Sequence, residues 1–539
     1  MLREPAPQQF EIEMVTLEEL VPQDHLLRKI DQFISFDFIR DKVRHCYCPD
    51  NGRPAVDPVI LFKMLFIGYL FGIRSERRLV QEIHLNVAYR WFLRMRLTDK
   101  VIDASTFSQT RRRRFADSSI HQEIFDEIVN QAMGYRMVGG RVLYTDSTHL
   151  KANANKKKLT EVEVTVTPKA YLDALDQAID EDRPQHGKKP LRRRVKAAKS
   201  EQSEQSEQSE QSEQSEQPEQ PEQPEQSEQP EQPEQPEQGK SQAAVPAGET
   251  RIIKQSTTDP DSGYMVREGK PKGFFYLDHR TVDAKYAIIT DSFITPGNVH
   301  DSVPYLSRLD RQIETFGFEV EAVGLDAGYN NAPLCHGLVE RGLEHSVIGY
   351  CRPSKRKGML AKRDYRYDAQ QDCYHCPQNE ILRYQTTNGD GYRLYASDPD
   401  KCRECPLRAQ CTKSKSGIKQ VSRHVWQGER ERIDQNRLTE PGKQIYKGRQ
   451  ETVERSFADA KQHHGHRYAR YRGLAKVQMQ GLLAAACQNM KKIALVHSRK
   501  GSKGTNPANP PPEGLFGAIE RYLMPFEWRR WPICRLVSQ

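Results

Sequence analysis

The most informative segment of the chain is Tyr446-Lys-Gly-Arg-Gln-Glu-Thr-Val-Glu-Arg-Ser-Phe-Ala-Asp-Ala-Lys461. It predicts a helix, because it contains no proline, a single glycine near its start and mostly good helix formers. Val453, Phe457 and Ala460 recur at spacings of four and three and form an apolar stripe. The stripe indicates that one face of this helix packs on a hydrophobic core.

The acid of interest in this helix is Glu454. Glu454 and Lys461 are seven residues apart, so they project from one face two turns apart. A carboxylate beside a packing stripe and among Arg and Lys residues suits a metal ion held next to a phosphate. The alternative is a solvated glutamate in a helix with surface ion pairs, and the helix alone does not separate the two.

Composition indicates a polyanionic partner. The chain has 539 residues, enough for two to four domains, and a formal charge of +9. Residues 201–238 consist of Glu-Gln-Ser and Glu-Gln-Pro triplets, with thirteen Glu and no Lys or Arg. Without these thirteen negative charges the rest of the chain carries +22. Such a charge favours DNA or RNA as a partner, although a merely basic soluble protein is the alternative.

Membrane insertion and secretion are not expected. No apolar segment follows Met1. The most apolar run, 59–73, is interrupted by Lys63 and is short for a bilayer, so it predicts a buried helix. The odd number of eleven cysteines, five of them within 373–411, is typical of a reducing cytosol and a metal site rather than a disulfide framework. We therefore expect a cytoplasmic protein.

The first 135 residues read as mostly helical, and one of these helices carries a run of arginines. Asp103-Ala-Ser-Thr106 offers a helix start before this run. The functional interpretation is phosphate contact, and the alternative is a solvated helix face. The four residues concerned are Arg111, Arg112, Arg113 and Arg114.

Two short strands are each expected to end in an aspartate. Arg141-Val-Leu-Tyr-Thr-Asp146 and Glu321-Ala-Val-Gly-Leu-Asp326 are rich in strand formers and end in an acid at the rim of a sheet. An aspartate also ends many strands as a turn former or helix cap. The order of strand, meander, helix, strand, helix, strand, insertion and helix predicts a mixed α/β sheet.

The insertion before the last helix contains a cysteine cluster. Paired thiolates at C-x-x-C spacing can bind one tetrahedral Zn²⁺, and a closed four-cysteine site would be structural. An Fe–S cluster, or thiols without metal, are the alternatives. Cys373 is the spare or substitute ligand beside the preferred set of Cys376, Cys402, Cys405 and Cys411.

Together these motifs resemble those of the DDE transposases of bacterial insertion sequences, in the branch with an N-terminal helical domain and a cysteine-bearing insertion before the last acid. The matching pieces are Tyr144-Thr-Asp-Ser-Thr148, Thr295-Pro-Gly-Asn-Val-His-Asp-Ser302, Leu325-Asp-Ala-Gly-Tyr329, the cysteine cluster and the Tyr446, Arg449, Glu454, Lys461 signature. Four residues separate Arg449 from Glu454, where the family commonly has three. Glu451 is therefore a rival to Glu454, which alone keeps the seven-residue step to Lys461.

The resemblance implies a ribonuclease-H-like catalytic core that cuts DNA at the ends of an insertion sequence and joins those ends to target DNA. Asp146, Asp326 and Glu454 would be catalytic and would hold two Mg²⁺ or Mn²⁺ ions. Tyr446, Arg449 and Lys461 would contact DNA, whereas His300 and Asp301 would have supporting roles. The expected partners are double-stranded DNA, both terminal inverted repeats and target, and a second copy of the chain. A metal-dependent nuclease without strand transfer and a catalytically silent, zinc-bearing DNA-binding protein are the rival functions.

The resemblance also orders the domains. We expect a helical DNA-binding domain over 1–135, the first part of the core over 136–350, a disordered insertion over 187–250, a cysteine-rich probable zinc insertion over 351–440, the last core helices over 441–500, and a linker with a C-terminal tail over 501–539. The protein is expected to associate with the bacterial nucleoid.

Overall fold

The computed structural model describes residues 14–48, 55–115, 119–165, 171–191, 250–266, 272–350 and 358–502. The Glu-Gln repeat, most of the 187–250 insertion and the tail after 502 lie outside these residues. The described chain forms two compact units. Unit 1 draws on 1–166, 248–355 and 426–539, and unit 2 draws on 167–247 and 356–425.

The N-terminal part of unit 1 is helical, as expected. Its most apolar helix, α4, begins after Asp57, whose carboxylate accepts a hydrogen bond from Val59 N at 2.9 Å. Nearly every residue of α4 is buried, and no helix in the described part of the chain is long and apolar enough to cross a membrane. The helices are α1 Leu17–Leu20, α2 Leu26–Phe33, α3 Phe38–Val43, α4 Pro58–Leu70, α5 Glu76–Leu85, α6 Val87–Phe92, α7 Ala104–Phe115 and α8 Ile120–Gly134.

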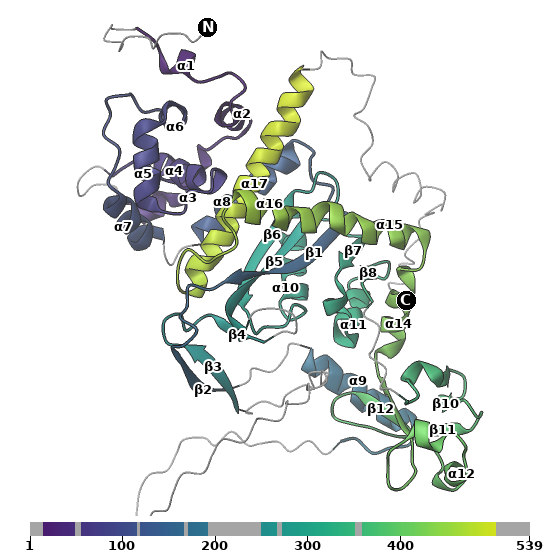
Figure 1. Ribbon diagram of the computed structural model, residues 1–539. Helices are drawn as coiled ribbons and strands as arrows, with labels where there is room; N and C mark the ends of the chain where they lie inside the picture. Colours follow the sequence, from purple (N-terminus) through teal and green to yellow (C-terminus); the bar gives the residue numbers. More distant parts are fainter. Residues whose placement is uncertain are drawn as a thin grey trace, which may run out of the picture. The chain divides into compact units, whose positions relative to one another are not determined.

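A mixed sheet forms the centre of unit 1 (Figure 1), which confirms the mixed α/β class. β5 lies between β6 and β1 and is antiparallel to both, whereas β7 is parallel to β1 and to β8. The short β4 pairs with the start of β5. The strands are β1 Val142–Lys151, β4 Gly263–Met265, β5 Gly273–Asp283, β6 Ile289–Pro296, β7 Ala322–Leu325 and β8 Val347–Ile348, and a separate hairpin joins β2 Leu159–Thr165 to β3 Thr250–Ser256.

The first strand is longer than the sequence suggested. We expected it to end at Asp146, but β1 continues to Lys151, because its second half keeps β5 as a partner. Its pairing with β7 does end at this point, since the last parallel pair is Thr145 with Leu325. Asp146 and Asp326 are therefore the first residues beyond the shared edge of the two strands.

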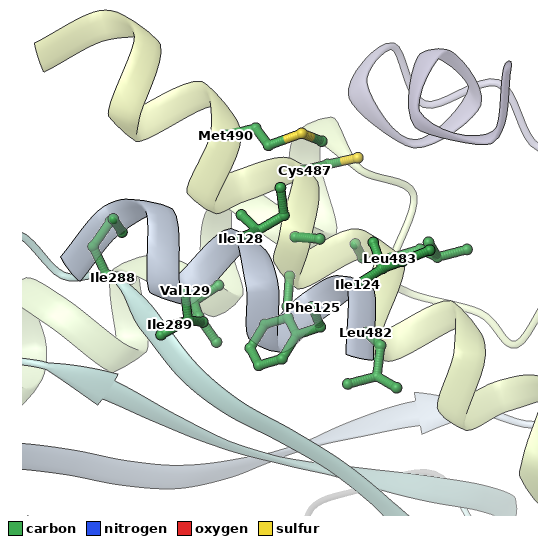
Figure 2. Packing of buried hydrophobic residues seen from close by; sticks show 14 of the residues in the cluster. Ile124, Phe125, Ile128, Val129, Ile288, Ile289, Leu482, Leu483, Cys487 and Met490 are labelled. Carbon is green, nitrogen blue, oxygen red and sulfur yellow. The ribbon is translucent and has the colours of Figure 1, made fainter. Parts of the chain in front are cut away.

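One hydrophobic core joins the N-terminal helices to the sheet. Ile124, Phe125, Ile128 and Val129 of α8 pack against Leu482, Leu483, Cys487 and Met490 of α17 and against Ile288 and Ile289 at the start of β6 (Figure 2). The remaining helices of this unit are α10 Tyr305–Phe316, α11 Ala332–Glu340, α14 Gln427–Asn436, α15 Glu440–Arg449, α16 Arg455–His463 and α17 Leu474–Ser502.

Unit 2 is an antiparallel sheet with a helix from before the Glu-Gln repeat. The strand order is β13-β12-β11-β10-β9, and a cluster of tyrosines, Leu382 and Val421 fills its core. Asp182 of α9 accepts hydrogen bonds from Arg393 and Thr387 of the sheet, so α9 belongs to this unit. The elements are α9 Leu172–Gln185, β9 Arg366–Asp368, β10 Cys373–His375, β11 Ile381–Thr387, β12 Tyr392–Ala396, α12 Pro399–Arg403, α13 Arg408–Cys411 and β13 Gln420–His424.

Candidate active site

Two aspartates of the candidate site lie at the edge shared by β1 and β7. The Asp146 side chain is 19% exposed, and its Oδ1 accepts a hydrogen bond from Ser147 N at 2.8 Å. Asp326 directly follows β7 and precedes a single 3₁₀ turn, η2 (Ala327–Tyr329), in which the buried Tyr329 anchors the chain. With 49% of its side chain exposed, Asp326 is the more accessible acid.

The third acid, Glu454, lies at the end of a π-helical turn. α15 ends at Arg449, the π turn η4 spans Gln450–Glu454, and α16 continues from Arg455. A π turn has an i to i+5 repeat, so it brings residues five apart to one face and absorbs one extra residue without rotating the flanking helices. This accounts for the four residues between Arg449 and Glu454.

The apolar stripe of this helix is buried, as expected. Val453 and Ala460 are 0% exposed and Phe457 is 6% exposed. The burial of these side chains fixes the rotation of η4 against β1 and β5 and that of α16 against α17. The fixed rotation directs Glu454, rather than the exposed Glu451, toward Arg449.

The buried guanidinium of Arg449 links all three acids. Its Nη2 lies 2.7 Å from Asp146 Oδ2 and 3.7 Å from Glu454 Oε1, and its Nη1 lies 3.5 Å from Asp326 Oδ1. The Arg449 side chain is only 5% exposed. Three carboxylates thus share one cation, which leaves an excess of negative charge at a partly open site.

Burial and the neighbouring charges together shift the pKa of Asp146. Burial raises the pKa of Asp146 to about 6, and the attraction of Arg449 offsets only part of that effect. The neighbouring Asp326 carboxylate raises the pKa further. The Asp146 carboxyl group therefore ionises less readily than usual, and a further cation nearby would favour its charged form.

Oxygen donors of this kind fit a divalent cation. Mg²⁺ is commonly held by one or two carboxylates together with waters and substrate phosphates, rather than by a complete protein cage. Asp146 and Asp326 on neighbouring strands provide such a pair. Within the described ranges, no three His, Cys, Asp or Glu side chains are grouped closely enough to hold one metal ion by themselves.

Comparisons with known proteins identify the family. A family model described as Transposase domain (DUF772) matches residues 15–113, and another described as Transposase DDE domain matches residues 375–494, which include Glu454 and Lys461. The chain is a DDE transposase. No curated protein matches it. Among solved structures it is similar to the cryo-EM structure of a piggyBac transposase synaptic complex with hairpin DNA, at 10% identity and a TM-score of 0.31, over 94% of this chain and 79% of that chain.

The other signature residues of the transposase lie around the acids. Lys461 Nζ donates a hydrogen bond of 2.5 Å to Thr148 Oγ1, so its ammonium group lies beside β1 two residues beyond Asp146. Tyr446 is partly buried, with its ring 5.7 Å from the guanidinium carbon of Arg449. The structure therefore gathers Tyr446, Arg449 and Lys461 around the same edge of the sheet.

Sequence reasoning gave Asp301 a supporting role without a partner. Asp301 Oδ1 accepts a hydrogen bond of 2.8 Å from the hydroxyl of Ser147, the residue after Asp146. Asp301 also lies near Gly328 in the turn after Asp326. It thus connects the two chain segments that carry the aspartates, a link that only the folded chain reveals.

The arginine run of α7 is not uniformly solvated. Arg111 is buried, with Nη2 2.7 Å from Glu76 Oε1 and its guanidinium 4.5 Å from the ring of Tyr471. Arg114 lies 4.1 Å from the ring of Tyr47. The expectation that Arg111 faces a phosphate is corrected here, because its charge is already balanced inside unit 1. Arg112 and Arg113 are exposed.

The cysteines of unit 2 are partly buried at the edge of its tyrosine cluster. Cys376 and Cys411 both pack against this cluster, and the hydroxyl of Tyr365 lies 3.0 Å from Cys411 Sγ. Cys402 and Cys405 are partly exposed. The expected four-cysteine arrangement is not assembled among the described residues, where no metal-ligand group is present. Cys373 is buried, 3.8 Å from His375 Nε2.

Proposed function

We propose that this transposase cuts DNA at the ends of its insertion sequence and joins those ends to target DNA, in a ribonuclease-H-like core. The strand order of unit 1 supports this core, since β1, β7 and β8 are parallel and β5 and β6 form an antiparallel extension. The observation that carries the proposal is the convergence of Asp146, Asp326 and Glu454 on the single buried cation of Arg449.

The acids would hold divalent cations, Mg²⁺ or Mn²⁺, together with the phosphate of the substrate. Such ions lower the pKa of an attacking water or hydroxyl and neutralise the charge that develops on phosphate oxygens. Arg449 limits the repulsion among the three acids and holds Asp146 in position. Lys461, fixed by Thr148, would bind a neighbouring backbone phosphate.

Further partners and sites follow from this function. Joining two ends requires two active sites, so we propose a homodimer on DNA. Exposed Arg112 and Arg113 of α7 would contribute phosphate contacts. Cys376, Cys402, Cys405 and Cys411 all belong to unit 2, but a structural Zn²⁺ would have to draw their thiols together, because they are not grouped in the described structure. Action on chromosomal DNA would bring the protein to the bacterial nucleoid in the cytoplasm.

The proposal is tested by incubating the purified protein with duplexes that carry the inverted repeats flanking its gene and with a target plasmid, with and without Mg²⁺. We expect nicked ends and joined products for the wild type. Asp146→Asn, Asp326→Asn and Glu454→Gln should each lower the yield by about a thousandfold or more, because each removes a metal ligand.

Glu451→Gln is the matched control, since Glu451 is an exposed glutamate three residues away on the same segment. It should leave the yield close to that of the wild type. Cleavage without joined products would favour the metal-dependent nuclease. Equal processing by the wild type and all three acid variants would overturn the catalytic assignment, and no processing by any of them would favour a silent DNA-binding protein.

A further inference from the structure

A basic surface lies beyond the acids, where the loop between α16 and α17 meets the end of β1. We define this basic loop surface as Arg74, Lys151, Arg467, Tyr468 and Arg472, all of which are exposed. The loop carries the sequence Arg467-Tyr-Ala-Arg-Tyr-Arg472, which contains three arginines and two tyrosines. The proposed function uses none of these side chains.

The backbone of the loop extends the catalytic sheet. Lys151 N donates a hydrogen bond of 3.2 Å to Arg467 O, and Ala469 N donates one of 2.8 Å to Lys151 O. These bonds make a parallel bridge between Lys151 and Tyr468. The surface is therefore attached to the strand that carries Asp146, five residues earlier.

The inward side chains of the loop hold it rigidly. His464 and His466 are buried, and His466 Nε2 lies 2.9 Å from Asp278 Oδ2. The guanidinium of Arg470 lies 4.1 Å from the ring of Tyr69, and the ring of Tyr471 is covered by Arg111. Because these residues point inward, Arg467, Tyr468 and Arg472 face outward at fixed positions.

Two of the outward cations, Arg74 and Lys151, contact an aromatic ring, and Arg472 Nε donates a hydrogen bond of 3.0 Å to Asn153 O. Tyr468 is 47% exposed, and its ring lies 5.4 Å from the guanidinium carbon of Arg74 and 5.6 Å from Lys151 Nζ. No carboxylate of the described chain forms an ion pair with Arg74, Lys151, Arg467 or Arg472. Their charge is thus available to an external anion.

We propose that the basic loop surface binds the phosphate backbone of the duplex whose scissile phosphate reaches the acids. Five residues of β1 separate Asp146 from Lys151, which corresponds to about 16 Å of strand or about five base pairs along a duplex. Lys461, which is fixed at Thr148, lies between these two positions along β1. The inference rests on the proposed function, because it assigns the path of the DNA into that site.

Binding of a fluorescein-labelled 30-bp duplex of mixed sequence to the full chain tests the proposal, by anisotropy in EDTA over a range of salt concentrations. The variant combines Arg74→Gln, Lys151→Gln, Arg467→Gln and Arg472→Gln. Each phosphate contact contributes about 0.9 to the slope of log K against log salt, so the slope should fall by about 3 or more.

The matched control removes four exposed cations that already have acidic partners: Arg78→Gln, Arg141→Gln, Arg432→Gln and Lys443→Gln. Its net charge change is the same, but its slope should change by less than about 1.

A second pair of variants, Tyr468→Ala and Tyr468→Phe, tests the contribution of the Tyr468 ring. Alanine should weaken binding about tenfold, and phenylalanine, which keeps the cation–π contacts, should bind like the wild type.

Equal slopes for the wild type and the four-residue variant, or equal losses in the variant and the control, would overturn the proposal. Thermal unfolding of each variant must match the wild type, as expected for exposed positions. If the wild type does not cut DNA but the four-residue variant loses DNA binding, the basic loop surface is supported and the proposed function is wrong. If the wild type cuts DNA and the four-residue variant binds and cuts DNA as well as the wild type does, the proposed function is supported and the role of the basic loop surface is wrong.

Discussion

Two of the arginine–carboxylate clusters in unit 1, one around Arg280 and one around Arg449, are alike in chemistry but differ in burial and in the number of acids. Arg280 and Asp278 on β5 are both 0% exposed and lie 2.7 Å apart. Asp278 also accepts from Ser292 at 2.9 Å, and Arg280 donates to Gln488 at 2.8 Å. This cluster is fully buried and pairs one arginine with one aspartate, although Arg280 Nε has no hydrogen-bond partner there. The Arg449 cluster has three acids, two of them about half exposed.

The two clusters shift their aspartates in opposite directions. Burial alone would raise the pKa of Asp278, but Arg280 and His466 outweigh it and hold that pKa well below its usual range. At Asp146, burial outweighs Arg449 and raises the pKa to about 6. The difference teaches that the number of partners, and not the presence of an arginine, separates a structural ion pair from a site that can take up cations.

The largest expected effect is on folding. Asp278→Asn should lower the free energy of unfolding by about 3–5 kcal/mol, because it leaves the buried Arg280 charge uncompensated. Asp326→Asn, at a half-exposed position, should change it by less than about 0.5 kcal/mol. Urea denaturation of both variants measures this contrast, and similar losses for the two would show that the clusters are not different in kind.

Mg²⁺ should stabilise the folded protein only by binding to the acids of the Arg449 cluster. For the wild type we expect about 2.7 kcal/mol of added stability at a hundred times the dissociation constant, since the ion binds the folded state. Asp146→Asn should lose this gain. Thermal unfolding with and without Mg²⁺ measures it, with the exposed Glu451→Gln as the control that keeps the gain. An equal gain in Asp146→Asn would place the ion elsewhere.

The raised pKa of Asp146 predicts a pH dependence with a defined sign. Because the folded pKa of about 6 lies above the unfolded value of about 3.9, ionisation of Asp146 costs stability as pH rises between these values. In EDTA, Asp146→Asn should therefore match the wild type below about pH 4 and become the more stable protein toward pH 7. Mg²⁺ affinity of the wild type should rise with pH through about 6. A stability difference that does not change with pH would contradict this assignment.

The smallest effect concerns the π turn on which the Arg449 cluster depends. Deletion of the exposed Gln450 would let η4 relax to an α-helical turn while Arg449 and Glu454 stay on one face, so DNA processing should fall by less than about tenfold. Deletion of the exposed Ala458 in α16 rotates Lys461 by about 100° and should abolish processing. If both deletions abolish processing, the π turn does more than accommodate one residue.

Much of this site could be predicted because its signals are local. Val453, Phe457 and Ala460 repeat at helical spacing, and all three are buried. The strand patterns before Asp146 and Asp326 place both acids near one sheet edge, although the true end of β1 was missed. Its continuation depends on β5, whose partner residues lie more than 120 positions away along the chain.

Other features left no local signal. Arg111 looked like its neighbours in a run of four arginines, but Glu76 and Tyr471, which enclose it, are distant in the sequence. The docking of α9 on the cysteine-bearing sheet likewise depends on Arg393, more than 200 residues after Asp182.

The sequence by itself determined most element types and the apolar faces, and it singled out the three acids that converge on Arg449, because periodicity and residue chemistry are carried by neighbouring positions. Only the tertiary structure decided which cations remain available. Whether the charge of an arginine is neutralised depends on partners that are close in space and remote in sequence. The sequence therefore could not distinguish the site residue Arg449 from the structural Arg280, or the buried Arg111 from the exposed Arg467.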